Sequence, residues 1–574
     1  MGLTATTRRG RAVTIAAVAV VGGLLAALLL WPLAEGVRGA VVDPRGRFTT
    51  AYLATVFRNP IYLEGLRNAL AIAVLSTAVA GTLGIVAALL LHRYAFPGRR
   101  LLAALVPMPL MVPPFVGAVG IKQLLGVTGA LNALLARLHL IDPHAPIDWL
   151  RSGRFGVVVA LTAMHLYPIV YFNVQAALAG LNVEMEEAAR SLGCRGLRLF
   201  RKITLPAILP SVFAAASIVF IWAFTELGVP LMCDFQRVTS VQIFSGLKDL
   251  GRNPFVYALV VVVLATTVIF YALARRLVAR AGGHRVGSVK GVRAHRARRL
   301  PPLPSALVAG LLAGIVGVAA LPNVSVLLLA LSRDWYGTVL PSGLTLDHVR
   351  SALTNDVVVP SIGNSLRYVT LSTAFDLVVG TTIAYLVTRT RSRAARVLDI
   401  AAMLPLAIPG LALAFGYLAI SREGRPLAFL NPLRDPTALL VIAYAMRRLP
   451  FVVRSAAAGL QQISTALEEA AASLGAGALS TFTRVTLPLL APHLLAGGVF
   501  AFALSMLEVS DSLILAQRQA TYPITNAIYN LFQLLGDGRQ VAAALGLWAM
   551  LFLLSAIAVA RGLVGGKLGN MFRL

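Results

Sequence analysis

Apolar stretches of roughly bilayer length recur along the whole chain and are separated by shorter polar segments. A helix that crosses the hydrocarbon core of a membrane needs about 20 mostly apolar residues. Twelve stretches meet this requirement, and they cover residues 12–33, 66–91, 102–124, 156–177, 207–228, 255–279, 305–331, 363–388, 397–420, 437–457, 489–507 and 540–562. The pattern predicts an all-α polytopic membrane protein with about twelve transmembrane helices.

The composition favours a membrane protein over a soluble one. Of the 574 residues, 58% are hydrophobic and only 13% are charged, whereas soluble domains carry about 25% charged residues. A soluble enzyme and a disordered chain are therefore excluded. The two cysteines, Cys194 and Cys233, are too few for a disulfide framework or a four-ligand metal site, and we expect no metal to be bound.

The formal net charge of +28 indicates how the chain is oriented. Such a charge also suits a nucleic-acid-binding protein, but in a polytopic protein an excess of arginine and lysine marks the cytoplasmic loops. When the N-terminus is placed in the cytoplasm, the loops after the second, fourth and eighth spans face inward, and they contain Arg93, Arg190 and Arg389. An even number of spans returns the chain to the same side, so we expect both termini to be cytoplasmic.

The two halves of the sequence repeat one plan. Between about residues 160 and 230, adding 282 to a residue number reaches a matching residue, and nearer the N-terminus the offset is 296. The matches include Pro168 with Pro450, Glu226 with Glu508, Gly84 with Gly380, Arg93 with Arg389, and Gly120 with Gly416. Six spans in each half make the two halves parallel repeats.

The change of offset by 14 residues indicates a longer external loop in the first half, at residues 128–155, with a short helix around Leu131–Leu140. Residues 281–304 contain glycine, proline and many arginines but no apolar run. We therefore divide the chain into a first membrane domain (1–280), a basic cytoplasmic linker (281–304) and a second membrane domain (305–574).

The most specific motif lies in two matching cytoplasmic loops. The first reads Glu186-Glu187-Ala188-Ala189-Arg190-Ser191-Leu192-Gly193, then nine residues, then Ile203-Thr204-Leu205-Pro206. The second reads Glu468-Glu469-Ala470-Ala471-Ala472-Ser473-Leu474-Gly475, then nine residues, then Val485-Thr486-Leu487-Pro488. Glycine suits the C-terminal end of a helix, and proline is tolerated in a first turn. Each loop is therefore predicted to be a short helix, a reverse turn at glycine, a second short helix, and a proline that opens the next span.

This spacing resembles the EAA loop of permeases in ATP-binding cassette importers, in which EAA is followed by three residues, G, nine residues and I-x-L-P. The first copy matches at every defined position, and the second has Val485 where isoleucine is usual. The resemblance covers nearly the whole chain and is strongest to the fused, two-lobed permeases of the iron(III)-type branch. The segments 224–228 and 508–512 also resemble that branch. The resemblance implies the importer type I permease fold.

In such permeases each EAA loop docks on a cytoplasmic ATPase subunit. Carried over by position, the coupling residues are Glu187, Ala188, Ala189 and Gly193 in the first loop and Glu469, Ala470, Ala471 and Gly475 in the second. The resemblance also implies two ATPase subunits that bind the ATP, a periplasmic or extracytoplasmic substrate-binding protein, and a place in the bacterial inner (plasma) membrane.

The chain itself lacks the phosphate-binding sequence G-x-x-x-x-G-K-[ST], because Gly565-Gly566-Lys567 is too short a match. We therefore expect a transporter subunit rather than an enzyme, with no cofactor of its own. The resemblance suggests iron(III) as the substrate, with thiamine or a phosphonate as alternatives.

An ion-gradient-driven secondary transporter is the rival class, but it leaves both EAA loops unexplained. A membrane enzyme would need clustered intramembrane catalytic groups, and the sequence shows none.

Charged residues within predicted spans are candidates for the pathway, since ionisable groups are costly in a bilayer. Arg447 and Arg448 lie inside the tenth span, where the first half has His165 and Leu166. They either line the pathway and meet an anion or an anion-coordinated metal, or snorkel or pair near the cytoplasmic end.

Glu226 and Glu508 occupy matching places near the external ends of spans five and eleven. They either attract a cation or contact the binding protein, or they form a solvated or hydrogen-bonded helix end. Asp376, in span eight, is expected to pack or pair.

Prolines interrupt the third and ninth spans. They are Pro107, Pro109, Pro113 and Pro114 in the first half and Pro405 and Pro409 in the second. Backbone freed in this way is tolerated in a membrane only where it is buried or lines a cavity. These two spans are either candidates for the pathway or simply kinked.

Overall fold

The computed structural model describes residues 8–564, apart from residues 44, 112, 182, 250–253, 282–296, 391, 426 and 535. The described chain is almost entirely helical, which confirms the predicted all-α class. Its one sheet is a parallel pair of two-residue strands, in which Tyr94 aligns with Arg298 and Ala95 with Arg299. Most of the predicted linker 281–304 lies outside the described residues.

The first half contains fourteen α-helices, one strand and four short π or 3₁₀ turns among the described residues. In order they are α1 (Arg8–Leu25), η1 (Ala26–Leu30), α2 (Trp31–Val41), α3 (Ala51–Arg58), α4 (Pro60–Arg93), β1 (Tyr94–Ala95), α5 (Arg99–Leu105), η2 (Met108–Met111), α6 (Pro114–Leu125), α7 (Ala130–Arg137), α8 (Trp149–Ala179), α9 (Val183–Ser191), α10 (Gly196–Leu199), η3 (Phe200–Thr204), α11 (Leu205–Phe224), α12 (Gly228–Met232), α13 (Thr239–Ser245), η4 (Gly246–Asp249) and α14 (Phe255–Ala281).

The second half contains a similar set of elements, in a partly different order. They are β2 (Arg298–Arg299), α15 (Pro302–Ala330), α16 (Asp347–Ser351), α17 (Val358–Arg389), α18 (Arg393–Met403), η5 (Leu404–Leu406), α19 (Gly410–Ile420), η6 (Ala428–Leu430), α20 (Thr437–Gln462), α21 (Thr465–Ser473), α22 (Ala478–Thr481), η7 (Phe482–Thr486), α23 (Leu487–Met506), α24 (Ser510–Leu515), η8 (Gln519–Thr521), α25 (Ile524–Gln533) and α26 (Gly538–Val564). The predicted external helix around Leu131–Leu140 is α7.

The predicted spans are largely present in the described chain. Ten helices are long and apolar enough to cross a membrane, and the segments Arg393–Leu406 and Gly410–Ile420 form an eleventh that is bent by 102°. The remaining predicted span, the tenth, is α20, which has 26 residues but carries three arginines, Arg447, Arg448 and Arg454.

The predicted third span, residues 102–124, is broken at its prolines, as the sequence predicts. Its apolar residues are divided among α5, η2 and α6, and the candidate span in this region, Pro114–Arg137, comprises α6 and α7. Proline has no N–H and clashes with the preceding turn, so the run between Pro107 and Pro114 cannot continue one helix. The ninth span breaks in the same way, between Leu406 and Gly410.

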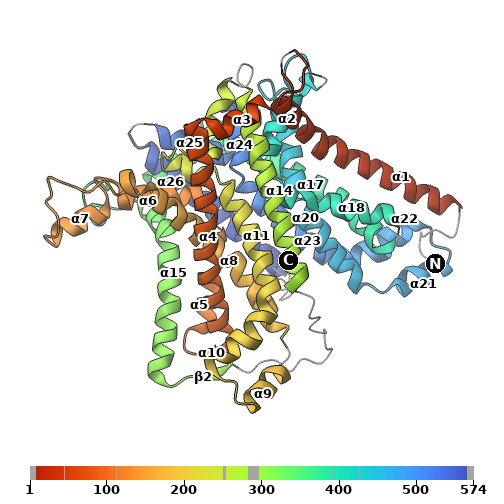
Figure 1. The fold of residues 1–574 in the computed structure, drawn as a ribbon, viewed down its shortest axis with the longest axis horizontal. Helices are drawn as coiled ribbons and strands as arrows, with labels where there is room; N and C mark the ends of the chain where they lie inside the picture. The colour runs from red at the N-terminus through yellow and green to blue at the C-terminus, as the bar shows by residue number, and fades with distance from the viewer. Residues whose placement is uncertain are drawn as a thin grey trace.

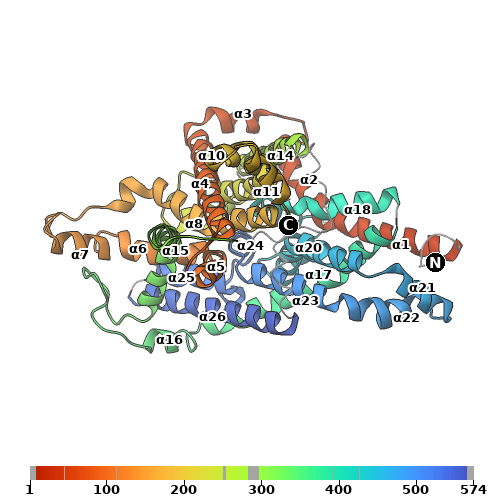
Figure 2. The same cartoon turned by 90° about the horizontal axis from the view of Figure 1, so that it is seen from below.

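Each half has a core of three long helices that pack on one another. They are α4, α8 and α11 in the first half and α17, α20 and α23 in the second (Figures 1 and 2). The first two helices of each core cross at a glycine. A Cβ added to Gly84 would lie 2.7 Å from the Cβ of Val170, and one added to Gly380 would lie 2.9 Å from Cγ1 of Val452. The repeat in the sequence is thus a repeat in packing.

The first spanning helix of each half crosses to the other half. α2 packs between α14 of its own half and α19 of the second, and α15 packs between α26 of its own half and α6 of the first. Both crossings rest on a glycine: a Cβ on Gly416 would lie 2.5 Å from the Pro32 carbonyl oxygen, and one on Gly120 would lie 2.5 Å from that of Pro322. The predicted limits therefore describe the order along the sequence. In space, α2 also packs on the second half and α15 also packs on the first.

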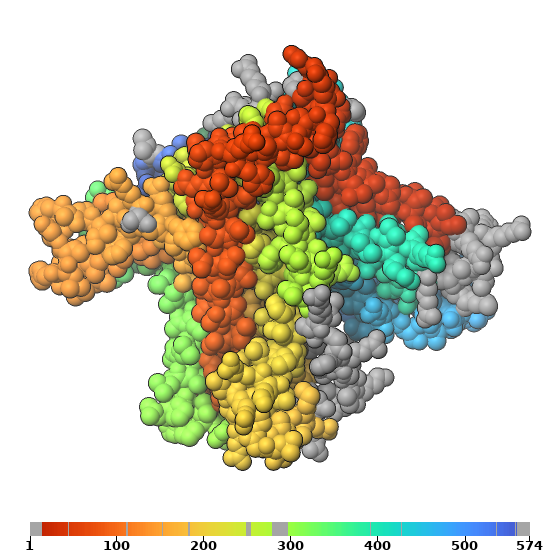
Figure 3. All heavy atoms as spheres, viewed as in Figure 1, coloured from red at the N-terminus to blue at the C-terminus, as the bar shows by residue number. Residues whose placement is uncertain are grey.

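The two EAA segments lie at the ends of separate lobes. In both ribbon views, α10 of the first half lies well apart from α22 of the second (Figures 1 and 2). In the space-filling view, the yellow lobe that ends in α9 and α10 and the blue lobe that ends in α21 and α22 point in different directions (Figure 3). The molecule is therefore forked on the side that carries these loops.

Candidate functional site

The two EAA loops have the same backbone geometry. A short helix, α9 or α21, ends at a glycine with positive φ, +80° at Gly193 and +83° at Gly475. The next N–H donates back into the helix, from Cys194 to the Ala189 carbonyl at 2.9 Å and from Ala476 to the Ala471 carbonyl at 3.0 Å. A second short helix, a π turn and the long α11 or α23 follow. The predicted sequence of helix, glycine turn, helix and proline is confirmed in both loops.

The predicted coupling residues lie on the surface of these helices. Glu187, Ala188 and Gly193 are exposed, as are Glu469, Ala470 and Gly475, and Ala189 and Ala471 are partly exposed.

The sequence analysis missed the leucines beside the predicted coupling residues. Leu192 and Leu474 are each 89% exposed, and Leu197 and Leu479 are exposed as well. These leucines match at the offset of 282, so the repeat itself could have revealed them.

The first glutamate of each loop faces the interior of the protein, away from the exposed coupling residues. Glu186 is only 7% exposed and Glu468 only 4% exposed. Each pairs with an arginine at the end of a spanning helix, Glu186 with Arg93 and Glu468 with Arg389. These residues were also missed as a site, although Arg93 and Arg389 already stood out as a match in the repeat.

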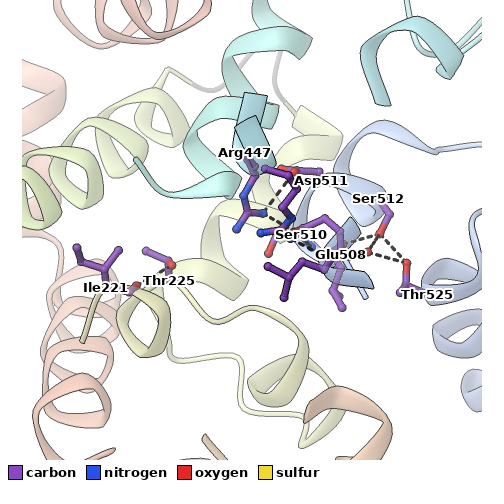
Figure 4. A network of polar contacts seen from close by, with 11 residues as sticks. Ile221, Thr225, Arg447, Glu508, Ser510, Asp511, Ser512 and Thr525 are labelled. Carbon is purple, nitrogen blue, oxygen red and sulfur yellow. Dashed lines mark hydrogen bonds and ion pairs between the residues drawn. The ribbon is translucent and has the colours of Figure 1, made fainter. Parts of the chain in front are cut away.

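A second site, an ionic cluster, lies in the interior of the second half (Figure 4). Arg447 Nη1 lies 2.5 Å from Glu508 Oε1 and 3.3 Å from Asp511 Oδ2. Arg448 Nη2 lies 2.5 Å from Glu508 Oε2 and 3.0 Å from the Leu504 carbonyl oxygen. One carboxylate thus joins both guanidinium groups.

The arginines do not extend to a helix end. Both lie near the middle of α20, and their partners follow α23, so the structure favours internal pairing over snorkelling. Asp511, which completes the cluster, was not predicted as a site residue, because its counterpart in the first half is Val229 and the repeat gave no signal there. Asp376 is buried nearby, and neither of its carboxylate oxygens has a hydrogen-bond partner in the described chain.

The first half places a glutamate but no arginine at the corresponding point. Glu226 Oε1 accepts a hydrogen bond from the Val229 N–H at 3.2 Å, and Glu226 forms no ion pair among the described residues. The two segments nevertheless meet: a Cβ on Gly228 would lie 3.3 Å from Cγ1 of Val509. In place of Arg447, His165 lies with Nδ1 2.8 Å from the Pro109 carbonyl oxygen.

A small pocket lies where the two halves meet at the broken ninth span. Ile221 and Trp222 of α11 and Thr225, just after α11, line it from the first half. The second half contributes Pro405, Leu406, Ile408, Pro409, Gly410, Arg447, Arg448 and Phe451. A Cβ on Gly410 would overlap the Arg447 guanidinium group, so this glycine leaves room for the arginine in its observed position. The pocket, of about 20 Å³, is about large enough for one water molecule.

The structure thus gathers three of the four predicted pathway residues, Arg447, Arg448 and Glu508, and places Glu226 across the contact between the halves. The broken backbone at Pro405 and Pro409 lines the same pocket, as expected for a proline-interrupted span. Among the described residues, no group of three or more histidine, cysteine, aspartate or glutamate side chains is arranged to hold a metal ion.

Comparison with known proteins identifies a family. The family model described as "Binding-protein-dependent transport system inner membrane component" matches twice, over residues 80–283 and 377–562. These two matches cover both repeats, and each includes one EAA loop.

Several curated proteins are similar to the chain over much of its length. The probable ABC transporter permease protein y4fN of Sinorhizobium fredii is 27% identical over 446 residues, which are 77% of this chain and 75% of that protein. The putative ferric transport system permease protein FbpB 1 of Haemophilus influenzae is 26% identical over 80% of this chain and 70% of its own length. The sulfate transport system permease protein CysT of Salmonella typhimurium is 31% identical over 45% of this chain and 90% of its own length.

Proposed function

The chain belongs to the family of binding-protein-dependent transport system inner membrane components, and from this premise we propose how it works as the permease subunit of an ATP-binding cassette importer. The two halves form the path of the substrate, and α9 and α21 each present a coupling surface to a cytoplasmic ATPase. Two ATPase subunits bind the ATP, and an extracytoplasmic binding protein delivers the substrate. The permease itself carries no cofactor, and its termini lie in the cytoplasm.

One observation carries the coupling proposal: the chain presents the same surface twice. Each surface combines the exposed EAA residues with a leucine that is 89% exposed, Leu192 in one loop and Leu474 in the other. A large apolar side chain held in water at the tip of a polar loop gains free energy when a partner covers it, about 25 cal/mol for each Å² buried. Two equal surfaces on separate lobes suit two equal partner subunits.

The coupling surface is tested by replacing both leucines. The variant with Leu192→Ser and Leu474→Ser is purified in detergent together with the ATPase subunits. We expect the bound ATPase to fall by at least ~10-fold, because each buried leucine contributes about 1.5–3 kcal/mol. Leu340→Ser is the matched control, because Leu340 is also exposed but lies between α15 and α16, outside the EAA loops. An unchanged amount of bound ATPase in the double variant contradicts this assignment.

We propose that the substrate passes between the halves at the four pathway residues. Glu226 approaches from the first half, and Glu508 with Arg447 and Arg448 from the second. Support comes from the pocket between the halves, which is lined by Arg447, Arg448 and the broken ninth span. Its small size fits a pathway that is closed at this level until the lobes move.

Iron(III) is the substrate we propose. Support comes from the similarity to a putative ferric transport permease over 80% of this chain, and from Glu226, which forms no ion pair among the described residues. The sulfate relative and the arginines favour an oxyanion as the second candidate, and a phosphonate belongs to that class. Thiamine is a further alternative from the sequence resemblance.

Uptake by proteoliposomes that contain the permease, the ATPases and the binding protein decides between these candidate substrates. We expect ATP-dependent uptake of radiolabelled iron(III), without uptake of sulfate, phosphonate or thiamine. ATP-dependent uptake of another solute overturns the substrate and leaves the permease assignment intact. Uptake driven by an ion gradient without ATP supports the secondary-transporter alternative instead.

A further inference from the structure

Each EAA helix is tied to the membrane helices by one buried glutamate. In the first half, Arg93 Nη2 donates to Thr204 Oγ1 at 2.9 Å, and the Thr204 hydroxyl donates to Glu186 Oε1 at 2.9 Å. Arg93 Nη2 itself lies 3.6 Å from the same Glu186 oxygen. We call Arg93, Glu186 and Thr204 the first clamp.

The second half repeats this arrangement. Arg389 Nε and Nη2 each lie 3.2 Å from Glu468 Oε1, and the Thr486 hydroxyl donates to the same oxygen at 3.0 Å. Arg389 also donates to the Ile463 carbonyl oxygen at 3.2 Å, just before α21. We call Arg389, Glu468 and Thr486 the second clamp. Its three residues match those of the first clamp at the offsets of 296 and 282, so the same contact occurs independently in two places.

The threonine of each clamp ends an unusual turn. Thr204 is the last residue of the π turn η3 and Thr486 the last residue of η7, and both threonines are fully buried. Single π turns within helices are rare and are frequent at functional sites. The repeat of a rare turn at both clamps indicates that this backbone places the threonine hydroxyl against the glutamate.

The clamps join elements that the chain connects only loosely. Each clamp links the last residue of α4 or α17, the surface helix α9 or α21, and the turn that leads into α11 or α23. Along the chain, the surface helix is followed by a glycine with open space around it, Gly193 or Gly475. A buried charge that loses its partner is strongly destabilising, so the clamp holds the helix far more firmly than the glycine turn does.

We propose that the two clamps are transmission joints, which make each EAA helix move as one body with the cytoplasmic ends of the two spans it touches. This inference rests on the proposed coupling to ATPases. Arg93, Glu186, Thr204 and their counterparts are positioning residues: they do not contact the ATPase but convert its movement into movement of α4 and α11, or of α17 and α23. Without the clamp, the surface helix pivots at its glycine and the spans stay in place.

The test measures the amount of substrate transported per ATP hydrolysed, in proteoliposomes that contain the ATPases and the binding protein. The double variant with Thr204→Val and Thr486→Val keeps the shape of each side chain and removes the hydroxyl. We expect this ratio to fall about tenfold while ATP hydrolysis and bound ATPase persist, since one lost buried hydrogen bond shifts an equilibrium by about that factor. The conservative variant with Thr204→Ser and Thr486→Ser should restore the ratio.

Thr483→Val is the matched control. Thr483 belongs to the same π turn as Thr486, but it is exposed and its hydroxyl binds the Leu479 carbonyl oxygen of its own helix. It should transport as wild type does.

The proposal is overturned when the valine variants keep the wild-type ratio. It is also overturned when transport, hydrolysis and bound ATPase decline together in proportion to lost stability, since a merely structural role does this. A wild-type complex without ATP-driven uptake instead refutes the proposed function.

Discussion

At their EAA loops the two halves are nearly copies, whereas at the ionic cluster they differ. Both loops turn at a glycine with φ near +80° and bury a glutamate against an arginine and a threonine. In the cluster, Arg447 and Arg448 correspond to His165 and Leu166, and Asp511 corresponds to Val229. Only the glutamate is shared.

This difference separates two kinds of constraint. Under the proposed function, a surface that docks on two like partners has to keep one shape in both halves, and the EAA loops share their shape down to single hydrogen bonds. A single pathway between the halves imposes no such symmetry, because one load meets both sides at once. The second half accordingly has paired arginines beside its glutamate, where the first half has a histidine and a leucine.

The largest expected effect on stability comes from replacing the matching glutamate of each half by glutamine, in two separate variants. Glu508→Gln should lower the free energy of unfolding by about 3–5 kcal/mol, because it leaves Arg448 buried without its carboxylate partner. Glu226→Gln should change it by less than about 0.5 kcal/mol, since the amide oxygen still accepts the Val229 N–H. Thermal unfolding in detergent measures both, and equal losses would remove the asymmetry on which the comparison rests.

The second effect concerns compensation within the cluster. Adding Arg448→Leu to Glu508→Gln gives position 448 the leucine that the first half has at position 166. The buried Arg448 charge, which Glu508→Gln leaves without a carboxylate, is then removed, and so is the free energy that its burial costs. We expect a coupling energy of about 1–3 kcal/mol in a double-mutant cycle, measured by unfolding. Strict additivity would show that Arg448 and Glu508 do not stabilise each other.

The third effect tests the symmetric part of the fold. Gly120→Ala and Gly416→Ala each place a Cβ 2.5 Å from a backbone carbonyl oxygen of a crossing helix, and backbone cannot move aside as a side chain can. We expect each to cost about 1–3 kcal/mol, with similar losses in the two halves. Gly314→Ala in α15, where a Cβ meets open space, is the control and should not destabilise. A loss of stability at only one of the two glycines would contradict the matching contacts of α2 with the second half and of α15 with the first.

The smallest effect concerns the two loop turns. Gly193→Ala and Gly475→Ala should each cost about 1 kcal/mol, because an L-residue with φ near +80° is strained, although neither site is crowded. Hydrogen exchange of α9 and α21 should report the loss locally. Asparagine at the same positions should be tolerated better than alanine, and a larger loss for asparagine would show that contacts rather than φ decide these positions.

The sequence by itself determined the class of the protein, its repeat and the shape of its EAA loops. Apolar length, the positions of glycine and proline, and the spacing of the EAA motif act over a few turns of chain, so they can be recognised without knowing what lies next to them. For the same reason the breaks at Pro107–Pro114 and Pro405–Pro409 were predicted, and so was the glycine turn in both loops.

Only the tertiary structure decided which charged groups meet and which helices pack against the opposite half. Arg447 and Asp511 are 64 residues apart, and Arg389 and Glu468 are 79 apart, so their pairing depends on where long helices cross. The sequence could not separate buried Glu186 from exposed Glu187, because adjacent residues on a surface helix differ only in the direction in which they point. That direction is fixed by Arg93 and Thr204, which the fold brings to the helix from two other spans.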